Sequence, residues 1–179
     1  IGVGWYENNK WNYKSYICKD STYEEEFRIM DEFIGFIRSR NNPTINYWCA
    51  EANFWDKAEN RQFELTNDIE RKDHISDNWK IKKWCDLYNI FKEDSIVIKD
   101  CFNFGLKSIA KAMQKHNMIT AILETNCSSG LSAMIKASNC YKYNSDPDTC
   151  EVMQDIRKYN EYDCKVLWEI ITYLRNNHV

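Results

Sequence analysis

A tyrosine and an aspartate one helical turn apart, Tyr159 and Asp163, have the residue types and spacing best suited to chemistry. Asp163 lies on one face of a predicted helix with regularly spaced aliphatic residues, namely Ile156, Leu167, Ile170, Ile171 and Leu174. A carboxylate therefore points along an apolar face. Because burying an ionised carboxylate without a partner costs several kcal/mol, Asp163 needs a cation, a cluster of donors or a metal ion.

Two interpretations of Asp163 are open at this point. In the first, the helix is rolled slightly, Asp163 lies at the edge of the apolar face, and a lysine or arginine from elsewhere neutralises it. In the second, the Tyr159 phenol hydrogen-bonds a water or a phosphate that is held at the carboxylate. The Tyr-x-x-x-Asp pattern is short and occurs often by chance, so other features of the chain must decide.

Length and composition limit the kind of protein this is. The chain has 179 residues, of which 44% are hydrophobic and 15% aromatic, and this predicts a single domain over 1–179 with a real core. Its formal net charge of -3 means that a nucleic acid would be held by a local basic patch or by bound cations. The sequence shows neither a long apolar segment nor a leader, which predicts a soluble, intracellular protein of the cytoplasm or nucleus.

The eight cysteines are scattered and form no Cys-x-x-Cys pair. This distribution favours reduced, partly buried thiols of an intracellular protein. A zinc site made by Cys127, Cys140 and Cys150 is the alternative.

The first part of the chain predicts strands followed by a helix. Residues 1–18 are rich in β-branched and aromatic types around Asn8 and Asn9, which suit a tight turn, and this predicts a β-hairpin. A capping-box pattern that begins at Thr22 predicts a helix over 23–39.

The remainder alternates short apolar runs with helix-like segments, so the fold class is mixed α/β. We expect a strand at 44–48, helices over 50–66, 104–116 and 129–141, and a last helix beginning near Cys150. The charged, aperiodic residues 67–80 are expected to form a loop with at most a short turn. Asp86, within an apolar run, is interpreted as a helix cap in preference to a metal ligand.

Several segments in this order resemble the DnaQ-type exonucleases of the ribonuclease-H-like superfamily, and most closely their YprB-like branch of predicted nucleases. The segments are "TINYWCAEANFWDKA", "KWCDLYNIF", "FGLKSIAKAM", "GLSAMIKASNCY" and "IRKYNEYDCKVLWEIITYLRN". The resemblance covers nearly the whole chain and is most specific at "YNEYDC". It implies a mixed sheet flanked by helices and metal-dependent 3′–5′ hydrolysis of phosphodiester bonds in DNA or RNA, for repair or processing.

The resemblance also implies the site. In that superfamily four carboxylates bind two divalent metals, Mg²⁺ or Mn²⁺, and a tyrosine or histidine orients the attacking water. Tyr159 and Asp163 match the last motif in its tyrosine form, known as DEDDy. The middle carboxylate, which follows a strand, corresponds to Glu51, with Asp56 in "NFWD" as the fallback. Glu51 is preferred, and because the two acids are five residues apart they are not expected to share a metal.

The first motif of the superfamily, Asp-x-Glu on a central strand, would lie immediately before Ile1 and is absent from this sequence. One hypothesis is that the chain is N-terminally incomplete and that upstream residues of a longer polypeptide supply this strand. The other hypothesis is an inactive module that binds nucleic acid or protein. Implied partners are a single-stranded nucleic-acid end and helicase or RecB-type nuclease modules. The abundance of Asn and Lys is typical of an AT-rich genome such as that of a large DNA virus.

Overall fold

The computed structural model describes residues 1–122, 130–143 and 146–178. Its contacts divide the chain into two compact units, Ile1–Ile29 with His116–Val179, and Met30–Lys115. Helix α1 (Tyr23–Ser39) runs through the division. The expectation of a single domain over 1–179 stays a prediction.

The first unit begins with an antiparallel hairpin of β1 (Gly2–Glu7) and β2 (Lys10–Ser15). Asn8 and Asn9 form its turn with φ values of 53° and 59°. Asparagine tolerates this left-handed region better than most residues, and two such residues in succession make the tight turn that matches the twist of the strands. The predicted hairpin is therefore confirmed.

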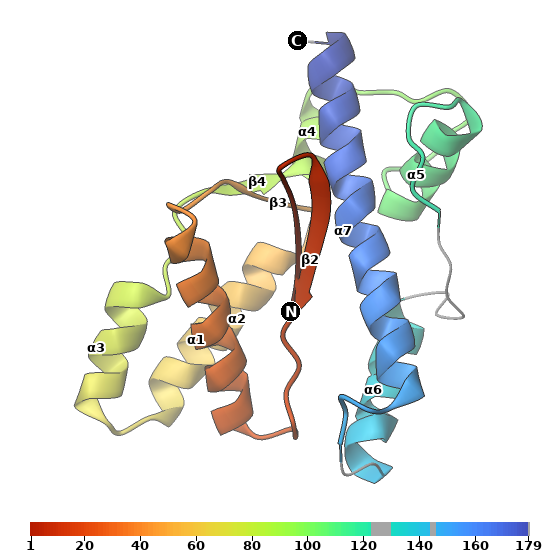
Figure 1. Cartoon of the computed structure of the whole chain (residues 1–179). Coiled ribbons are helices and arrows are strands. Elements are labelled where there is room, and N and C mark those ends of the chain that lie inside the picture. Colours follow the sequence, from red (N-terminus) through yellow and green to blue (C-terminus); the bar gives the residue numbers. More distant parts are fainter. Residues whose placement is uncertain (123–129, 144–145, 179) are drawn as a thin grey trace. The chain divides into compact units, whose positions relative to one another are not determined.

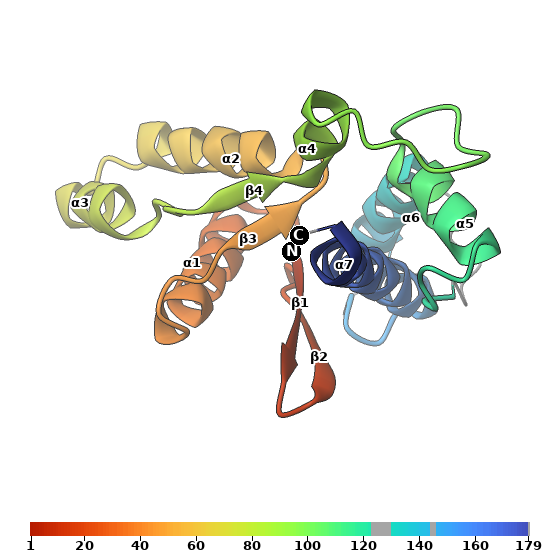
Figure 2. The ribbon, with the colours of Figure 1, turned by 90° about the horizontal axis from the view of Figure 1, so that it is seen from above.

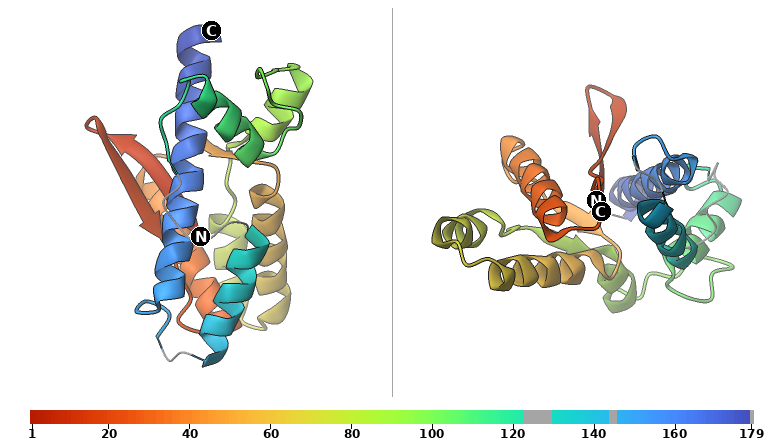
Figure 3. Two further views of the ribbon diagram at one scale, coloured as in Figure 1. Left: turned by 90° about the vertical axis from the view of Figure 1, so that its right-hand side faces the viewer. Right: turned by 90° about the horizontal axis from the view of Figure 1, so that it is seen from below.

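The long last helix of this unit, α7 (Glu151–His178), packs against β1 (Figure 1). The close approach depends on glycine, because a Cβ built on Gly4 would lie 3.1 Å from the Cβ of Cys164 and 2.2 Å from the Trp11 ring. One turn along α7, the Trp168 ring stacks on Tyr6 with their centroids 5.3 Å apart. Helix α6 (Gly130–Tyr143) packs on α7 as well (Figure 3, left).

The second unit contains two short parallel strands, β3 (Ile45–Tyr47) and β4 (Trp84–Asp86), which lie side by side in Figure 2. Helices α2 (Glu51–Leu65) and α3 (Ile69–Asn78) connect them. Helices α4 (Leu87–Glu93) and α5 (Leu106–Lys115) follow. Parallel strands need a long crossover connection of this kind, because a tight turn would make the second strand antiparallel to the first.

The core of the second unit is aromatic. Trp79 is completely buried, and its indole nitrogen donates to the Asp31 carboxylate at 3.0 Å. The Trp55 indole nitrogen donates to the Trp79 carbonyl oxygen at 3.0 Å, and the Trp55 ring lies 5.4 Å from that of Phe33. Each buried indole therefore has a hydrogen-bond acceptor, as buried polar groups require.

Helix α3 corrects the expectation of a loop over 67–80. Its residues show little apolar periodicity, but Ile75 is buried and Asp68 caps the helix by accepting hydrogen bonds from the backbone of Glu70 and Arg71. The cap, the burial of Ile75 and packing against α2 thus stabilise a helix that periodicity does not indicate.

The fold is mixed α/β, as predicted, whereas its ribonuclease-H-like character stays a prediction. Within the described residues no helix is both long and apolar enough to cross a membrane. Seven cysteines are free thiols, and the eighth, Cys127, with the zinc site that would need it, lies outside the described residues.

Candidate functional site

The carboxyl ends of β3 and β4 bring polar residues of the second unit together. The strands are parallel with Tyr47 opposite Asp86, so both chains leave the sheet at the same edge. Asp86 is the last residue of β4 and precedes α4, and Glu51 begins α2 shortly after β3. In larger open α/β sheets the carboxyl ends of parallel strands are where ligands bind.

Asp86 links the segments that follow β3 and β4 by hydrogen bonds. Its Oδ1 accepts hydrogen bonds from the backbone nitrogens of Tyr88 at 2.9 Å, Asn89 at 3.4 Å and Cys49 at 3.0 Å. The first two cap α4, which confirms the predicted capping role. The third reaches across to the segment that follows β3, and this contact is visible only in the folded chain.

The segment between β3 and α2 is held in an unusual backbone conformation. Cys49 has φ 78°, a value that residues with a Cβ rarely adopt. Its neighbour Trp48 is fixed by ring contacts to Tyr88 and Phe91 and by a hydrogen bond from its indole nitrogen to the Phe104 carbonyl oxygen at 3.1 Å. Such strain persists only where the surroundings impose it, and it is frequent at functional sites.

Glu51 is oriented by the same segment. Its Oε2 accepts from the backbone nitrogens of Trp48 at 3.3 Å and Ala50 at 3.2 Å, and its side chain is exposed. Asp56, the fallback residue, is exposed too but lies about 140° around α2 from Glu51. The two acids therefore point to different sides, as their spacing predicted.

The pKa of the Tyr47 phenol reflects its partial burial and the negative charges at this edge of the sheet. Its pKa is raised, first by partial burial and then by the negative charges of Asp86 and Glu51. A hydrogen bond with Asp86 acts in the same direction. Two carboxylates thus act on one neutral phenol, and the edge has a negative potential that favours cations.

Tyr159 and Asp163 belong to α7 in the other unit. Both are half-buried, and Asp163 stands three residues before the fully buried Val166 and seven before Ile170. The apolar face predicted for this helix therefore does contain the aspartate. Its hairpin-facing side is different and carries Cys164 and Trp168.

The predicted site residues lie on two helices. Tyr159 and Asp163 lie one turn apart on α7, and Glu51 lies at the start of α2, with Asp86, the predicted helix cap, at the same sheet edge. Among residues 1–122, 130–143 and 146–178, no three His, Cys, Asp or Glu side chains are grouped as a metal site would require.

Sequence reasoning missed Tyr47. The run "TINYW" indicates a strand, but nothing in it shows which residue ends opposite an aspartate. The register of the parallel pair was the necessary information, and a single sequence does not contain it.

Removing the Asp86 carboxylate should cost more stability than removing an ordinary helix cap. We expect Asp86→Ala to lower the free energy of unfolding by about 1.5–3 kcal/mol, because a cap and a cross-segment hydrogen bond are both lost. Urea denaturation measures this. Asp68→Ala is the matched control, since Asp68 caps α3 through two backbone nitrogens only, and it should cost about 1 kcal/mol. Equal losses in the two variants would contradict a role for the Cys49 contact.

No family model, curated protein or solved structure matches the chain. A function for this protein must therefore be inferred from its own residues and their geometry.

Proposed function

We propose that this chain is a ribonuclease-H-like domain of a metal-dependent 3′–5′ exonuclease that hydrolyses phosphodiester bonds of DNA or RNA. The observation that carries the proposal is the parallel pairing of β3 and β4, which puts Glu51 and Asp86 at one edge around Tyr47. The order of elements agrees with the resemblance, since a hairpin and a helix come before the strand that precedes Glu51.

The residues at this edge fit Mg²⁺ or Mn²⁺ in their chemistry. Carboxylate oxygens are the donors that these hard cations prefer, and Glu51 is exposed and held by two backbone nitrogens. By the motif, Glu51 and Asp163 would hold the ions, together with the Asp-x-Glu residues that the resemblance expects. Bound in this way, two ions would activate water and offset the charge that develops on the phosphate.

The residues of the chain orient the Glu51 carboxylate and would position the attacking water or the phosphate. The backbone nitrogens of Trp48 and Ala50 fix the direction of the Glu51 carboxylate before any ligand arrives. Asp86 fixes that segment in turn through the Cys49 nitrogen. The Tyr159 hydroxyl, one turn from Asp163, would hold the attacking water or the scissile phosphate by a hydrogen bond.

A nuclease assay with two matched variants tests the proposal. The natural polypeptide, including any residues before Ile1, is incubated with end-labelled DNA and RNA in Mn²⁺, in Mg²⁺ and in EDTA. We expect shortening from the 3′ end in the presence of metal only. Glu51→Gln should slow cleavage about a hundredfold or more, because a ligand charge is lost, whereas Asp56→Asn should leave the rate within about twofold.

Two results would contradict this assignment. Loss of activity in Asp56→Asn with normal activity in Glu51→Gln would transfer the ligand role to the fallback residue. Absence of cleavage under every metal condition, with the fold intact by circular dichroism, would leave only the inactive binding module.

A further inference from the structure

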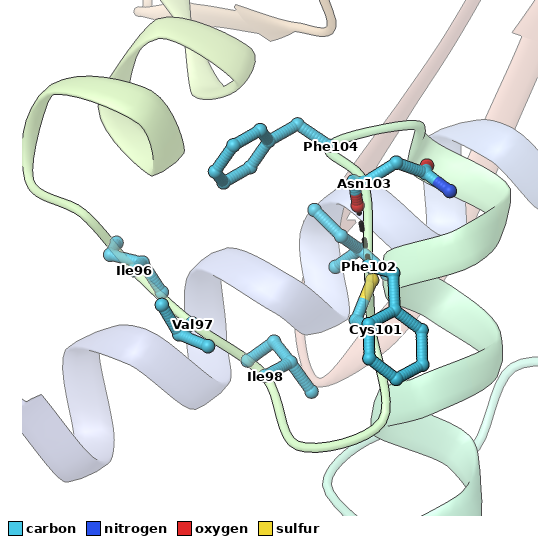
Figure 4. A pocket seen from close by; sticks show the side chains of 8 residues that line it. Ile96, Val97, Ile98, Cys101, Phe102, Asn103 and Phe104 are labelled. Atoms are coloured by element: carbon cyan, nitrogen blue, oxygen red, sulfur yellow. Dashed lines mark hydrogen bonds between the residues drawn. The ribbon is translucent and has the colours of Figure 1, made fainter.

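A small apolar hollow lies in the segment between α4 and α5, within the second unit (Figure 4). Its volume is about 160 Å³. The two limbs of the segment face each other across it, and the Phe104 ring is directed toward the opposite limb. The lining residues are Ile96, Val97, Ile98, Cys101, Phe102, Asn103, Phe104 and Ile109.

Two of these side chains are exposed to an unusual degree. Phe102 is 95% exposed and Val97 is 80% exposed, although Ile98 and Ile109 beside them are buried. An apolar or stacking contact with an aromatic ring that is fully in water is favourable, because it removes apolar surface from water. Exposed apolar groups gathered at a hollow mark a binding surface more often than isolated ones do.

The segment is fixed and connected to the candidate site. The Phe104 carbonyl oxygen accepts from the Trp48 indole nitrogen, and Trp48 lies three residues before Glu51. The Asn103 side chain accepts from the Gly105 nitrogen at 2.9 Å, which stabilises the turn into α5. A ligand bound here would meet a preformed surface, and its entropic cost of binding would be lower for that reason.

The charge of this region is opposite to that of the chain. Residues 94–115, from the end of α4 to the end of α5, contain four lysines and two aspartates, a net charge of +2 against -3 for the whole sequence. Asp100 is paired with Lys115 at 2.6 Å. Lys99, Lys107 and Lys111 are exposed, and the net positive charge of the region favours a polyanion.

We propose that this hollow binds an unpaired base of a single-stranded nucleic acid, with Phe102 stacking on the base and the lysines attracting the phosphates. The inference rests on the proposed function, which supplies nucleic acid as the substrate class. An aromatic ring beside a basic surface is the combination by which single strands are held without sequence preference. An apolar segment of a partner protein would use the hollow but would gain nothing from the lysines.

Binding in EDTA tests the inference without cleavage. The natural polypeptide is titrated into a short fluorescent oligothymidylate and into an abasic oligomer of equal length, and fluorescence anisotropy is followed. We expect the wild type to bind the oligothymidylate more tightly. Phe102→Ala should weaken that binding about tenfold or more, and should leave abasic binding unchanged, because stacking needs the base.

Controls separate stacking from a general loss of apolar surface. Ile69→Ala removes an aliphatic side chain that is 74% exposed on α3, and it should leave both affinities unchanged. Lys111→Ala should weaken binding of both oligomers to the same degree, since it acts on the phosphates.

Several results would overturn the inference. The wild type could bind the two oligomers equally, or Phe102→Ala could weaken binding of both equally. Phe102→Ala could also leave oligothymidylate binding unchanged and alter the oligomeric state of the protein instead. The two proposals can fail independently. If the chain cleaves in the presence of metal and Phe102→Ala binds like the wild type, only the base site is contradicted. If binding depends on the base but no cleavage occurs, only the nuclease function is contradicted.

Discussion

We expect Asp163→Asn to slow the proposed metal-dependent cleavage by about a hundredfold or more and to leave the chain folded. The substitution keeps the size of the side chain but removes the charge that would offset a divalent cation, so both metal affinity and rate should fall. The measurement is the initial rate on labelled substrate over a range of Mn²⁺ concentrations. Far-UV circular dichroism checks the fold.

The matched control for this prediction is Asp155→Asn. It makes the same chemical change on the same helix, two turns earlier and outside the Tyr-x-x-x-Asp motif. We expect its rate to stay within about twofold of wild type. If Asp163→Asn were as active as Asp155→Asn, the carboxylate would have no role in catalysis, and its place on the apolar face would be structural.

The largest expected loss of stability comes from Trp79→Ala. Trp79 is completely buried, its indole nitrogen donates to Asp31, and its carbonyl oxygen accepts from Trp55. Truncation opens a cavity and removes the donor to a carboxylate. We expect the free energy of unfolding to fall by about 3–5 kcal/mol, a large part of the total for a protein of this size. Urea denaturation measures the change.

Two further variants make this result interpretable. Trp79→Phe retains most of the packing and loses only the indole donor, so it should cost less than Trp79→Ala and stay measurable if the alanine variant does not fold. Phe54→Ala removes a ring that is 66% exposed and should change stability by less than about 0.5 kcal/mol. Similar small effects in Trp79→Ala and Phe54→Ala would contradict the described core.

The sequence predicted those elements whose signals are local. The Asn8-Asn9 turn specifies the hairpin, and the capping residues with a regular apolar face specify α1, for which the predicted limits match Tyr23–Ser39. By contrast, α3 depends on one cap and one buried isoleucine, and β4 is three residues long. Both are stabilised by contacts with other elements, α3 with the preceding helix α2 and β4 with β3, and a single sequence does not reveal these contacts.

The same distinction applies to the site. Helical spacing was enough to put Tyr159 beside Asp163, and the residue type and position were enough to identify Asp86 as a cap. The link from Asp86 to the Cys49 nitrogen, and the effect of both acids on Tyr47, depend on strand register. Register between strands separated by two helices is set by tertiary packing, so these relations became visible only in the fold.

One carboxylate oxygen of Asp86 holds three amides from two stretches of chain. A rotation of the Asp86 side chain would free all three amides at once, because they share this acceptor. Such a movement would release the start of α4 and, at the same time, the backbone ahead of Glu51.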